Sequence, residues 1–188
     1  MTGVTAVDHD ERIVELCQQN RSSGFAQLLL AYQERVYRRA YSFVRRREDA
    51  LDITQEVFLK VIQAIPSLIP GRPLWPWLRR ITTNAALNFL RRRPALLSLD
   101  DGEGSHEVSG GADPAEAAMA AWDWGQLQVA LGRLPPLQRM AVILRHQEGL
   151  SYEEVARAMD LPLGTVKTYL FRARPTLRSE LAAQEGWS

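Results

Sequence analysis

Apolar residues recur at intervals of three and four along most of the chain, which is the spacing of one face of an α-helix. In the first half this spacing predicts a helix over about 23–45 and a second over about 50–65, which Pro66 ends. Pro76 suits the first turn of a third helix, which closes at the arginines 91–93. The predicted core face of this third helix comprises Trp77, Leu78, Ile81 and Ala85.

The second half of the chain continues the helical pattern. Another helical module begins with the apolar spacing of Ala117, Ala121, Trp124, Leu127, Leu131 and Leu134, and Pro135 and Pro136 interrupt it. A helix then extends to about His146, and Gly149 is suited to the left-handed backbone that often follows a helix end. Apolar and polar residues do not alternate as they would in a strand. We therefore expect an all-α fold of two small helical modules.

Two further helices, joined by a short turn, are predicted between Leu150 and Arg178. Ser151 can cap the first, and Glu154 follows three residues later as in a capping box. Pro162 ends that helix because proline disfavours helix at the residue before it, and Thr165 is the expected N-cap of the second helix. The apolar stripe of the second helix comprises Val166, Leu170, Ala173, Leu177 and Leu181.

The opposite face of this last helix is polar and basic. Spacing of four residues brings Lys167, Thr168, Phe171 and Arg172 into one patch. Cations for phosphates and polar groups for base edges suit a helix in the major groove, so the segment indicates a DNA-binding helix-turn-helix. An ordinary surface helix with a solvated basic face is the alternative, as is a Phe171 packed in the core. Pro175 is expected to kink the helix beyond its first two turns.

Charge is segregated along the chain, although the net charge is only +1. Residues 1–20 carry a net −3, residues 21–93 a net +9, residues 94–121 a net −6 and residues 122–188 a net +1. The strongly basic block predicts a polyanionic partner. The expected organisation is an N-terminal extension (1–21), a first helical module (22–93), a flexible acidic linker (94–121), a second helical module (122–183) and a tail (184–188).

The third predicted helix mixes aromatic and basic residues. Arg79, Arg80 and Asn84 can share a face away from Trp77. Exposed aromatics beside arginines are typical of proteins that bind single-stranded nucleic acid. The pattern favours a core position for Trp77, and for Trp75 it does not choose between the core and a nucleic-acid contact.

The second predicted helix has a polar side formed by Asp52, Gln55 and Glu56. Taken alone, this pattern favours a solvated surface. A face that recognises a basic partner helix is the alternative.

The sequence lacks the patterns of a catalytic, metal or cofactor site. His9, His106 and His146 are far apart and lack the spacing of metal ligands, and we find no glycine-rich phosphate loop or nucleophile elbow. Cys17 is the single cysteine, which excludes an intrachain disulfide and is typical of a core position. Without an apolar run of 18 residues or a signal peptide, we expect a cytoplasmic protein that does not insert into a membrane.

Three blocks, in this order, resemble the extracytoplasmic-function (ECF) class of bacterial sigma factors in the sigma-70-like family. They are DITQEVFLKV (52–61), WPWLRRITTNAALNFLRRR (75–93) and the segment from Leu134 to Arg178. The resemblance extends over about 22–93 and 122–183.

The resemblance implies a non-enzymatic subunit that directs core RNA polymerase to a subset of promoters and opens the DNA. The first module would bind the β′ clamp helices and the −10 element, and the second the β flap and the −35 element. The polymerase contacts implied are Asp52, Gln55, Glu56 and Phe58. The −10 contacts implied, which include the non-template single strand, are Trp75, Arg79, Arg80 and Asn84. The −35 duplex contacts implied are Lys167, Thr168, Phe171 and Arg172.

The loop at 66–75 corresponds to one that helps to pocket a flipped base in this family. Its prolines depart from the family pattern, as do Tyr169 and Pro175, so base preferences at −10 and −35 do not carry over. A cognate anti-sigma factor is an implied partner, and we expect no sensor domain after the second module. The rival hypothesis is a helix-turn-helix regulator that binds duplex operators as a dimer. It does not explain the two sequence blocks at 52–61 and 75–93.

Overall fold

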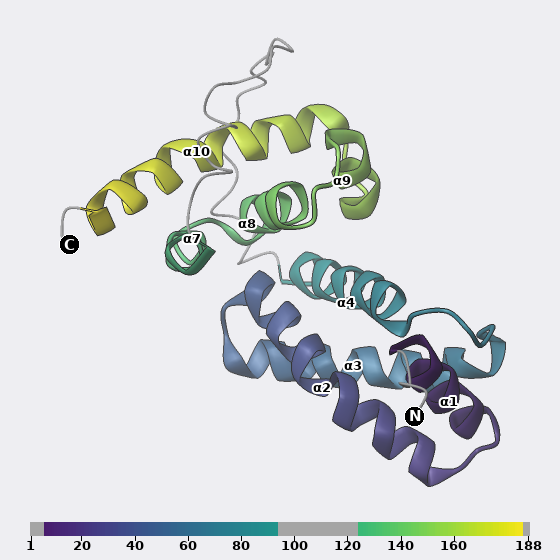
Figure 1. Ribbon diagram of the computed structural model, residues 1–188. Coiled ribbons are helices and arrows are strands. Elements are labelled where there is room, and N and C mark those ends of the chain that lie inside the picture. The colour runs from purple at the N-terminus through teal and green to yellow at the C-terminus, as the bar shows by residue number, and fades with distance from the viewer. Residues whose placement is uncertain (1–5, 94–123, 186–188) are drawn as a thin grey trace. The chain divides into compact units, whose positions relative to one another are not determined.

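The computed structural model describes residues 6–93 and 124–185, and every regular element within them is a helix (Figure 1). The chain divides into two units, Met1–Phe89 and Leu90–Ser188, and each is described by itself. The predicted all-α fold is confirmed. The acidic linker predicted at 94–121 lies outside the described residues.

The first unit is built from α1 (Ala6–Gln18), α2 (Ser22–Val44), α3 (Arg47–Ala64) and most of α4 (Leu74–Arg91). A 3₁₀ turn, η1 (Ile65–Ser67), follows α3 at the proline that was expected to end it. α2 packs along α3, and α1 packs on α2 and on η1 (Figure 1). Apolar side chains from all four helices form the core; its largest fully buried members are Ile13, Leu28, Phe43, Ile53, Ile65 and Leu78.

The core face of α4 differs from the predicted one. Leu78 and Ala85 are buried as expected, but Trp77 and Ile81 are only half-buried. Thr82 is fully buried in their place, and its hydroxyl donates to the carbonyl oxygen of Leu78 at 2.7 Å. A threonine that bonds its own helix four residues back satisfies its polar group, so it can occupy a core position that a pattern of apolar residues does not reveal.

Helix α1 lies in the segment that the sequence pattern treats only as an N-terminal extension. Its apolar face, which includes Ile13, Val14 and Cys17, is buried. The backbones of α1 and α2 approach so closely at Gly24 that a Cβ there would lie 2.6 Å from the backbone nitrogen of Cys17. The position of Cys17 in the core agrees with the expectation for a lone cysteine, and burial raises the pKa of its thiol.

The second unit contains α7 (Trp124–Leu131), α8 (Pro136–Val142), α9 (Tyr152–Met159) and α10 (Leu163–Glu185). A π-helical turn, η2 (Ile143–Gln147), extends α8 to the point where the sequence predicts that its helix ends. α10 packs on α7, α8 and α9. The predicted left-handed backbone at the helix end is present, since Gly149 has a φ of +68°.

The start of α9 is as predicted and the start of α10 is not. The Ser151 hydroxyl accepts from the Glu154 backbone nitrogen at 3.1 Å, and the Glu154 carboxylate accepts from the Ser151 nitrogen at 2.8 Å, which completes the capping box. Thr165 is not the N-cap of α10, because the carbonyl oxygen of Pro162 already accepts from the backbone nitrogen of Val166 at 3.2 Å. The helix also continues through Pro175 to its end at Glu185.

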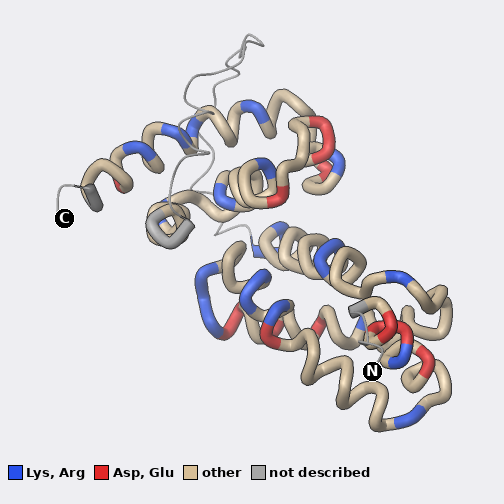
Figure 2. The backbone as a smooth tube through the Cα atoms, viewed as in Figure 1, with Lys and Arg blue, Asp and Glu red and all other residues tan. Residues whose placement is uncertain are grey.

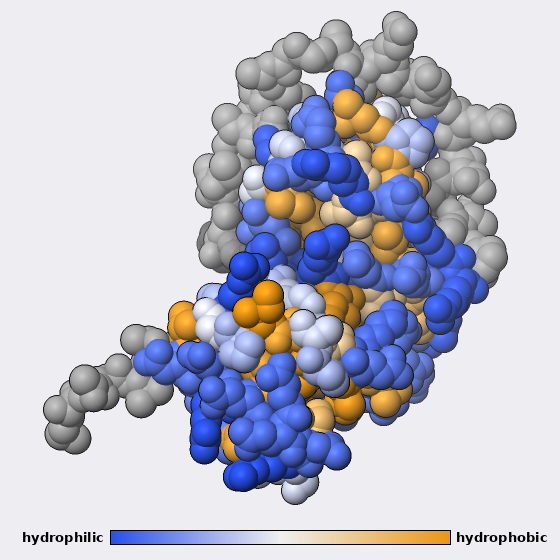
Figure 3. All heavy atoms as spheres, turned by 90° about the vertical axis from the view of Figure 1, so that its right-hand side faces the viewer, coloured by the Kyte–Doolittle hydropathy of each residue, from blue (hydrophilic) through white to orange (hydrophobic). Residues whose placement is uncertain are grey.

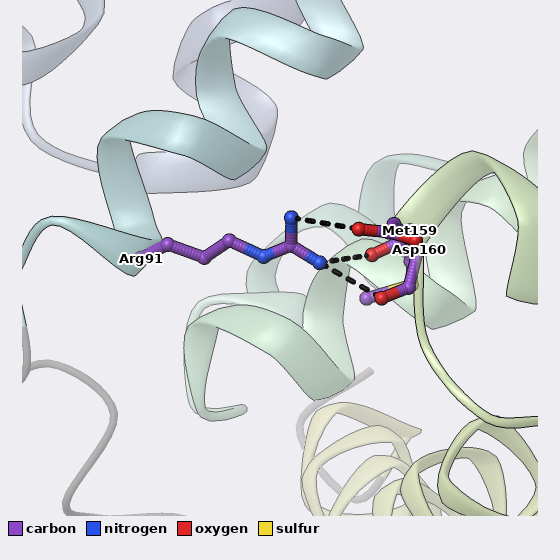
Figure 4. A network of polar contacts seen from close by, with 3 residues as sticks. All are labelled: Arg91, Met159 and Asp160. Atoms are coloured by element: carbon purple, nitrogen blue, oxygen red, sulfur yellow. Dashed lines mark hydrogen bonds and ion pairs between the residues drawn. The ribbon is translucent and has the colours of Figure 1, made fainter.

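The second unit begins at Leu90 and therefore includes Arg91, the last residue of α4. The Arg91 guanidinium donates to the carbonyl oxygens of Met159 and Asp160 at 2.8 and 2.9 Å (Figure 4). These carbonyls lie at the C-terminal end of α9, where a helix leaves its carbonyl groups unpaired and a cation is favourable. Asp160 itself adopts left-handed backbone, with a φ of +48°.

The described residues contain no helix with both the length and the apolar character needed to span a membrane. Within the same residues, no three histidine, cysteine or acidic side chains are grouped as metal ligands would be.

Candidate nucleic-acid and protein interfaces

The face of α10 that the sequence predicts for DNA is separate from its core stripe. The five apolar residues of the predicted stripe are all buried. On the remaining surface the Phe171 side chain is 45% exposed, while Lys167, Thr168 and Arg172 are half-buried. The Thr168 hydroxyl donates to the carbonyl oxygen of Gly164 at 2.9 Å, so its methyl group and hydroxyl oxygen define the local surface.

Basic residues follow one another along α10 (Figure 2). From its start to Arg178 the helix carries four cations, Lys167, Arg172, Arg174 and Arg178, and no acidic residue. Partial burial lowers the pKa of the Arg174 guanidinium, although an arginine keeps its charge in proteins. A basic helix of this kind attracts phosphates irrespective of sequence.

The residues of α4 that the sequence predicts to bind single-stranded DNA differ in their exposure. Asn84 and Arg80 are exposed and lie one turn apart, whereas Arg79 is half-buried. The Arg39 guanidinium of α2 donates to the Arg79 carbonyl oxygen at 3.2 Å and to the Thr83 hydroxyl at 2.7 Å. This link fixes α4 against α2, so the exposed amide and guanidinium project from a helix that is held in place.

Trp75 is half-buried in a stack of side chains. Its ring lies parallel to that of Tyr32, with centroids 6.4 Å apart, and the Arg35 guanidinium lies 4.0 Å from the Trp75 ring centroid. The Tyr32 hydroxyl donates to Asp10 at 2.5 Å. Burial, and then this hydrogen bond, raises the pKa of Tyr32 above its ordinary value, so the phenol stays protonated as a donor. The sequence did not choose between a core position and a nucleic-acid contact for Trp75, and in the structure the side chain is only half-buried.

Residues of the predicted polymerase-binding set on α3 fall on two sides of the helix. Asp52 and Gln55 are exposed, and the half-buried Glu56 pairs with Lys60 at 2.5 Å. Phe58 is only 6% exposed and belongs to the core, which its helical spacing also indicates. Its neighbour Leu59 is exposed at 63%, and Leu51 and Ile62 are also exposed apolar residues of α3. Leu59 lies one turn beyond Gln55, so the spacing could have identified it.

Other contacts at these sites have no counterpart in the sequence pattern. Arg35 covers the Trp75 ring, and Asp10 accepts a hydrogen bond from Tyr32, which stacks on that ring. Asp10 lies 65 positions before Trp75 in the chain. Local periodicity carries no information about partners at that separation.

Both units match known protein families. Residues 28–94 match the family described as Sigma-70 region 2, and residues 124–177 match Sigma-70, region 4. The chain is 32% identical over 182 residues to the RNA polymerase sigma-H factor of Pseudomonas aeruginosa, covering 93% of this chain and 94% of that protein. It is 34% identical over 180 residues to the ECF RNA polymerase sigma-E factor of Escherichia coli, covering 92% and 94%.

A solved structure supports the same assignment. The sigma factor RpoE from Bartonella quintana, in a co-crystal with the anti-sigma factor NepR, is 28% identical. It aligns with a TM-score of 0.51 over 84% of this chain and 96% of that one.

These matches show that the two helical units are those of a transcription initiation factor of the sigma-70 type. The chain belongs to the ECF class of the sigma-70 family. Such an alternative sigma factor directs core RNA polymerase to promoters with particular −10 and −35 elements. A solitary helix-turn-helix regulator is excluded, because the region 2 match covers the first unit as well.

Proposed function

We propose that this sigma factor uses three separate surfaces: α3 for core polymerase, α4 for the opened −10 element and α10 for the −35 duplex. The observation that carries the proposal is the exposure of Asn84 and Arg80 on a helix whose opposite face is core. An amide can pair with a base edge, and a guanidinium beside it can hold a phosphate. The factor acts as a non-enzymatic specificity subunit in the cytoplasm.

The −10 surface is tested with Asn84→Ala, and Arg80→Ala is the matched control on the same face. We expect Asn84→Ala to lose ~1–3 kcal/mol of discrimination at one −10 position, the worth of a good base contact. Arg80→Ala should weaken binding to all −10 variants alike and reduce its dependence on salt. Holoenzyme binding to forked promoters with every base at each −10 position measures both. An equal loss at all −10 variants for Asn84→Ala contradicts the base-reading role.

For core polymerase we propose the exposed side of α3, formed by Asp52, Gln55, Glu56 and Leu59. The buried position of Phe58 assigns that residue to support of the helix from behind. Leu59 and, three residues further, Ile62 add exposed apolar groups beside these polar residues, which is the composition of a protein interface with a small apolar centre.

The α3 surface is tested by the double charge reversal Asp52→Arg with Glu56→Arg. Like charges placed opposite each other at an interface cost several kcal/mol, so affinity for core polymerase should fall sharply. Glu34→Arg is the control, since Glu34 is an exposed acid on α2. Fluorescence anisotropy of labelled variants with core polymerase gives the affinities, and circular dichroism confirms the fold. Unchanged core affinity in a folded double mutant would remove α3 from the interface.

We also propose that a cognate anti-sigma factor holds this chain inactive. The Bartonella quintana sigma factor, which aligns with 84% of this chain, was crystallised with an anti-sigma factor, and this supports the partner class. Affinity purification of the tagged chain before and after envelope or oxidative stress identifies the partner. Recovery of core polymerase alone under every condition argues against one.

A further inference from the structure

The segment 68–73 connects η1 to α4 and forms the surface loop that corresponds to the predicted base pocket. Ile69 is 70% exposed, and Arg72 is also exposed. Gly71 has a φ of +84°, a left-handed conformation that favours glycine. This side of the first unit faces the viewer in Figure 3, where hydrophobic side chains are exposed among hydrophilic ones. A loop with exposed apolar residues needs support from outside itself to keep one shape.

Helix α1 supplies that support at the start of the loop. The Gln18 side chain, at the C-terminal end of α1, donates to the carbonyl oxygen of Ile65 at 3.1 Å and to that of Leu68 at 2.8 Å. One amide group therefore satisfies two backbone acceptors as the chain leaves η1. Midway along the loop, a Cβ on Gly71 would lie 3.8 Å from the Glu11 carboxylate, so α1 also lines the loop there.

Helix α1 supports the end of the loop as well. One oxygen of the Asp10 carboxylate accepts from the backbone nitrogen of Leu74, the first residue of α4, at 2.9 Å. The other oxygen accepts from the Tyr32 hydroxyl at 2.5 Å. Asp10 is 4% exposed, so these two donors compensate the cost of burying its polar atoms. An acidic side chain from another helix thus caps α4, a position where negative charge is favourable.

We propose that α1 is a brace that holds the 68–73 loop ready to receive an unpaired −10 base, with Asp10 and Gln18 as the positioning residues. The inference rests on the proposed −10 role of the first unit. A loop that is fixed at both ends before DNA arrives does not have to be ordered on binding, and that preorganisation favours the correct base. Loss of either anchor should loosen the loop and weaken discrimination at −10, while core binding and −35 binding are retained.

The test uses Asp10→Asn and Gln18→Met in the full chain. Asparagine keeps the size of Asp10 but has one acceptor oxygen for two donors, and methionine keeps the length of Gln18 without its donor. Glu15→Gln is the matched control, because it makes the same acid-to-amide change on α1 at a residue whose carboxylate pairs with Arg12 on its own helix. The single cysteine reports whether α1 stays docked: Cys17 is buried, so its reaction with a thiol reagent should stay slow.

Three quantities are measured for each variant assembled with core polymerase. They are affinity for core, affinity for a duplex −35 element, and discrimination among bases in a forked −10 template. For Asp10→Asn and Gln18→Met we expect −10 discrimination to fall by about tenfold, the order of magnitude of one or two lost hydrogen bonds, and the two affinities to stay within about twofold of the unmodified protein. Hydrogen exchange of the 68–74 amides should become faster in both variants and remain unchanged in Glu15→Gln.

Two results overturn the brace. Unchanged −10 discrimination in Asp10→Asn and Gln18→Met, on a template where Ile69→Ala or Asn84→Ala does reduce it, shows that the anchors do not position the loop. A loss that extends equally to core and −35 binding, with fast labelling of Cys17, shows that α1 only stabilises the fold. If Ile69→Ala and Asn84→Ala also leave discrimination intact, the proposed −10 surface itself is wrong.

Discussion

Alanine at Phe171 distinguishes a DNA contact from a core contact, because the preceding residue provides a matched control. Phe171 is 45% exposed, whereas Leu170 is 3% exposed on the same helix. Full burial of such a side chain contributes ~1.5–3 kcal/mol, so a side chain about half covered contributes ~1 kcal/mol. Leu170→Ala instead removes a buried group and leaves a cavity, which costs ~2–5 kcal/mol.

Both variants are measured in the full chain, by hydrogen exchange of the α8 and α10 amides and by binding to −35 duplex variants. We expect Phe171→Ala to lower the local opening free energy by ~1 kcal/mol and to lose ~1–3 kcal/mol of preference at one −35 position. Leu170→Ala should lower the local opening free energy by more than Phe171→Ala does, and it should weaken binding to all −35 variants alike. Equal destabilisation by the two changes would refute the reasoning. Phe171 would then be a core residue, and the DNA face would be redrawn around Lys167, Thr168 and Arg172.

Two further predictions concern stability. Gly24→Ala should prevent α1 from docking on α2, because the new Cβ would lie 2.6 Å from the Cys17 backbone nitrogen. Gly164→Ala is the control, since a Cβ there meets nothing within 4 Å. We expect fast thiol labelling of Cys17 in the first variant and slow labelling in the second. Ser151→Ala should cost ~1 kcal/mol in urea unfolding at neutral pH. Hydrogen bonds from Ser151, the backbone one first, lower the pKa of Glu154, so their contribution is present above the ordinary glutamate pKa and is lost as pH falls through the lowered value. Alanine at 151 keeps the backbone N–H that donates to the Glu154 carboxylate, so the pH test uses Glu154→Gln. The stability difference between Glu154→Gln and the unmodified chain should shrink in acid, and a difference that is constant down to pH 3 would contradict this account.

Features whose partners lie within one helical turn could be predicted from the sequence. The capping box of α9 requires only Ser151 and Glu154, and both of its hydrogen bonds form. The stripe on α10 likewise follows from spacing alone, since it is set by the helical repeat. The start of α10 could not be predicted in the same way. Threonine is a good N-cap, which favoured Thr165. The helix begins earlier because the Pro162 carbonyl oxygen accepts from the backbone nitrogen of Val166.

Features that depend on distant segments were outside the reach of the pattern. Helix α1 has a buried apolar face, but its function in the fold is set by contacts with α2, η1 and the start of α4. The core of α4 was missed for another reason: Thr82 is polar, so the spacing of apolar residues did not mark it, although its hydroxyl bonds only one turn back. On α3, Phe58 is buried in the core, although the resemblance to sigma factors implied a polymerase contact at the same position.

The environment of Trp75 decides how it can take part in −10 recognition. The Arg35 guanidinium covers its ring at 4.0 Å, and Tyr32 lies parallel to it. An exposed cation–π contact contributes ~0.5–1 kcal/mol, whereas stacking of a base on an aromatic ring contributes ~1–3 kcal/mol. By these magnitudes, a base that displaces Arg35 from the Trp75 ring would gain more than the lost cation–π contact. Before DNA binds, the same contact keeps the indole in one orientation and shields it from water. We therefore propose that Trp75 is a stacking platform for an unpaired −10 base and that Arg35 covers it in the free protein.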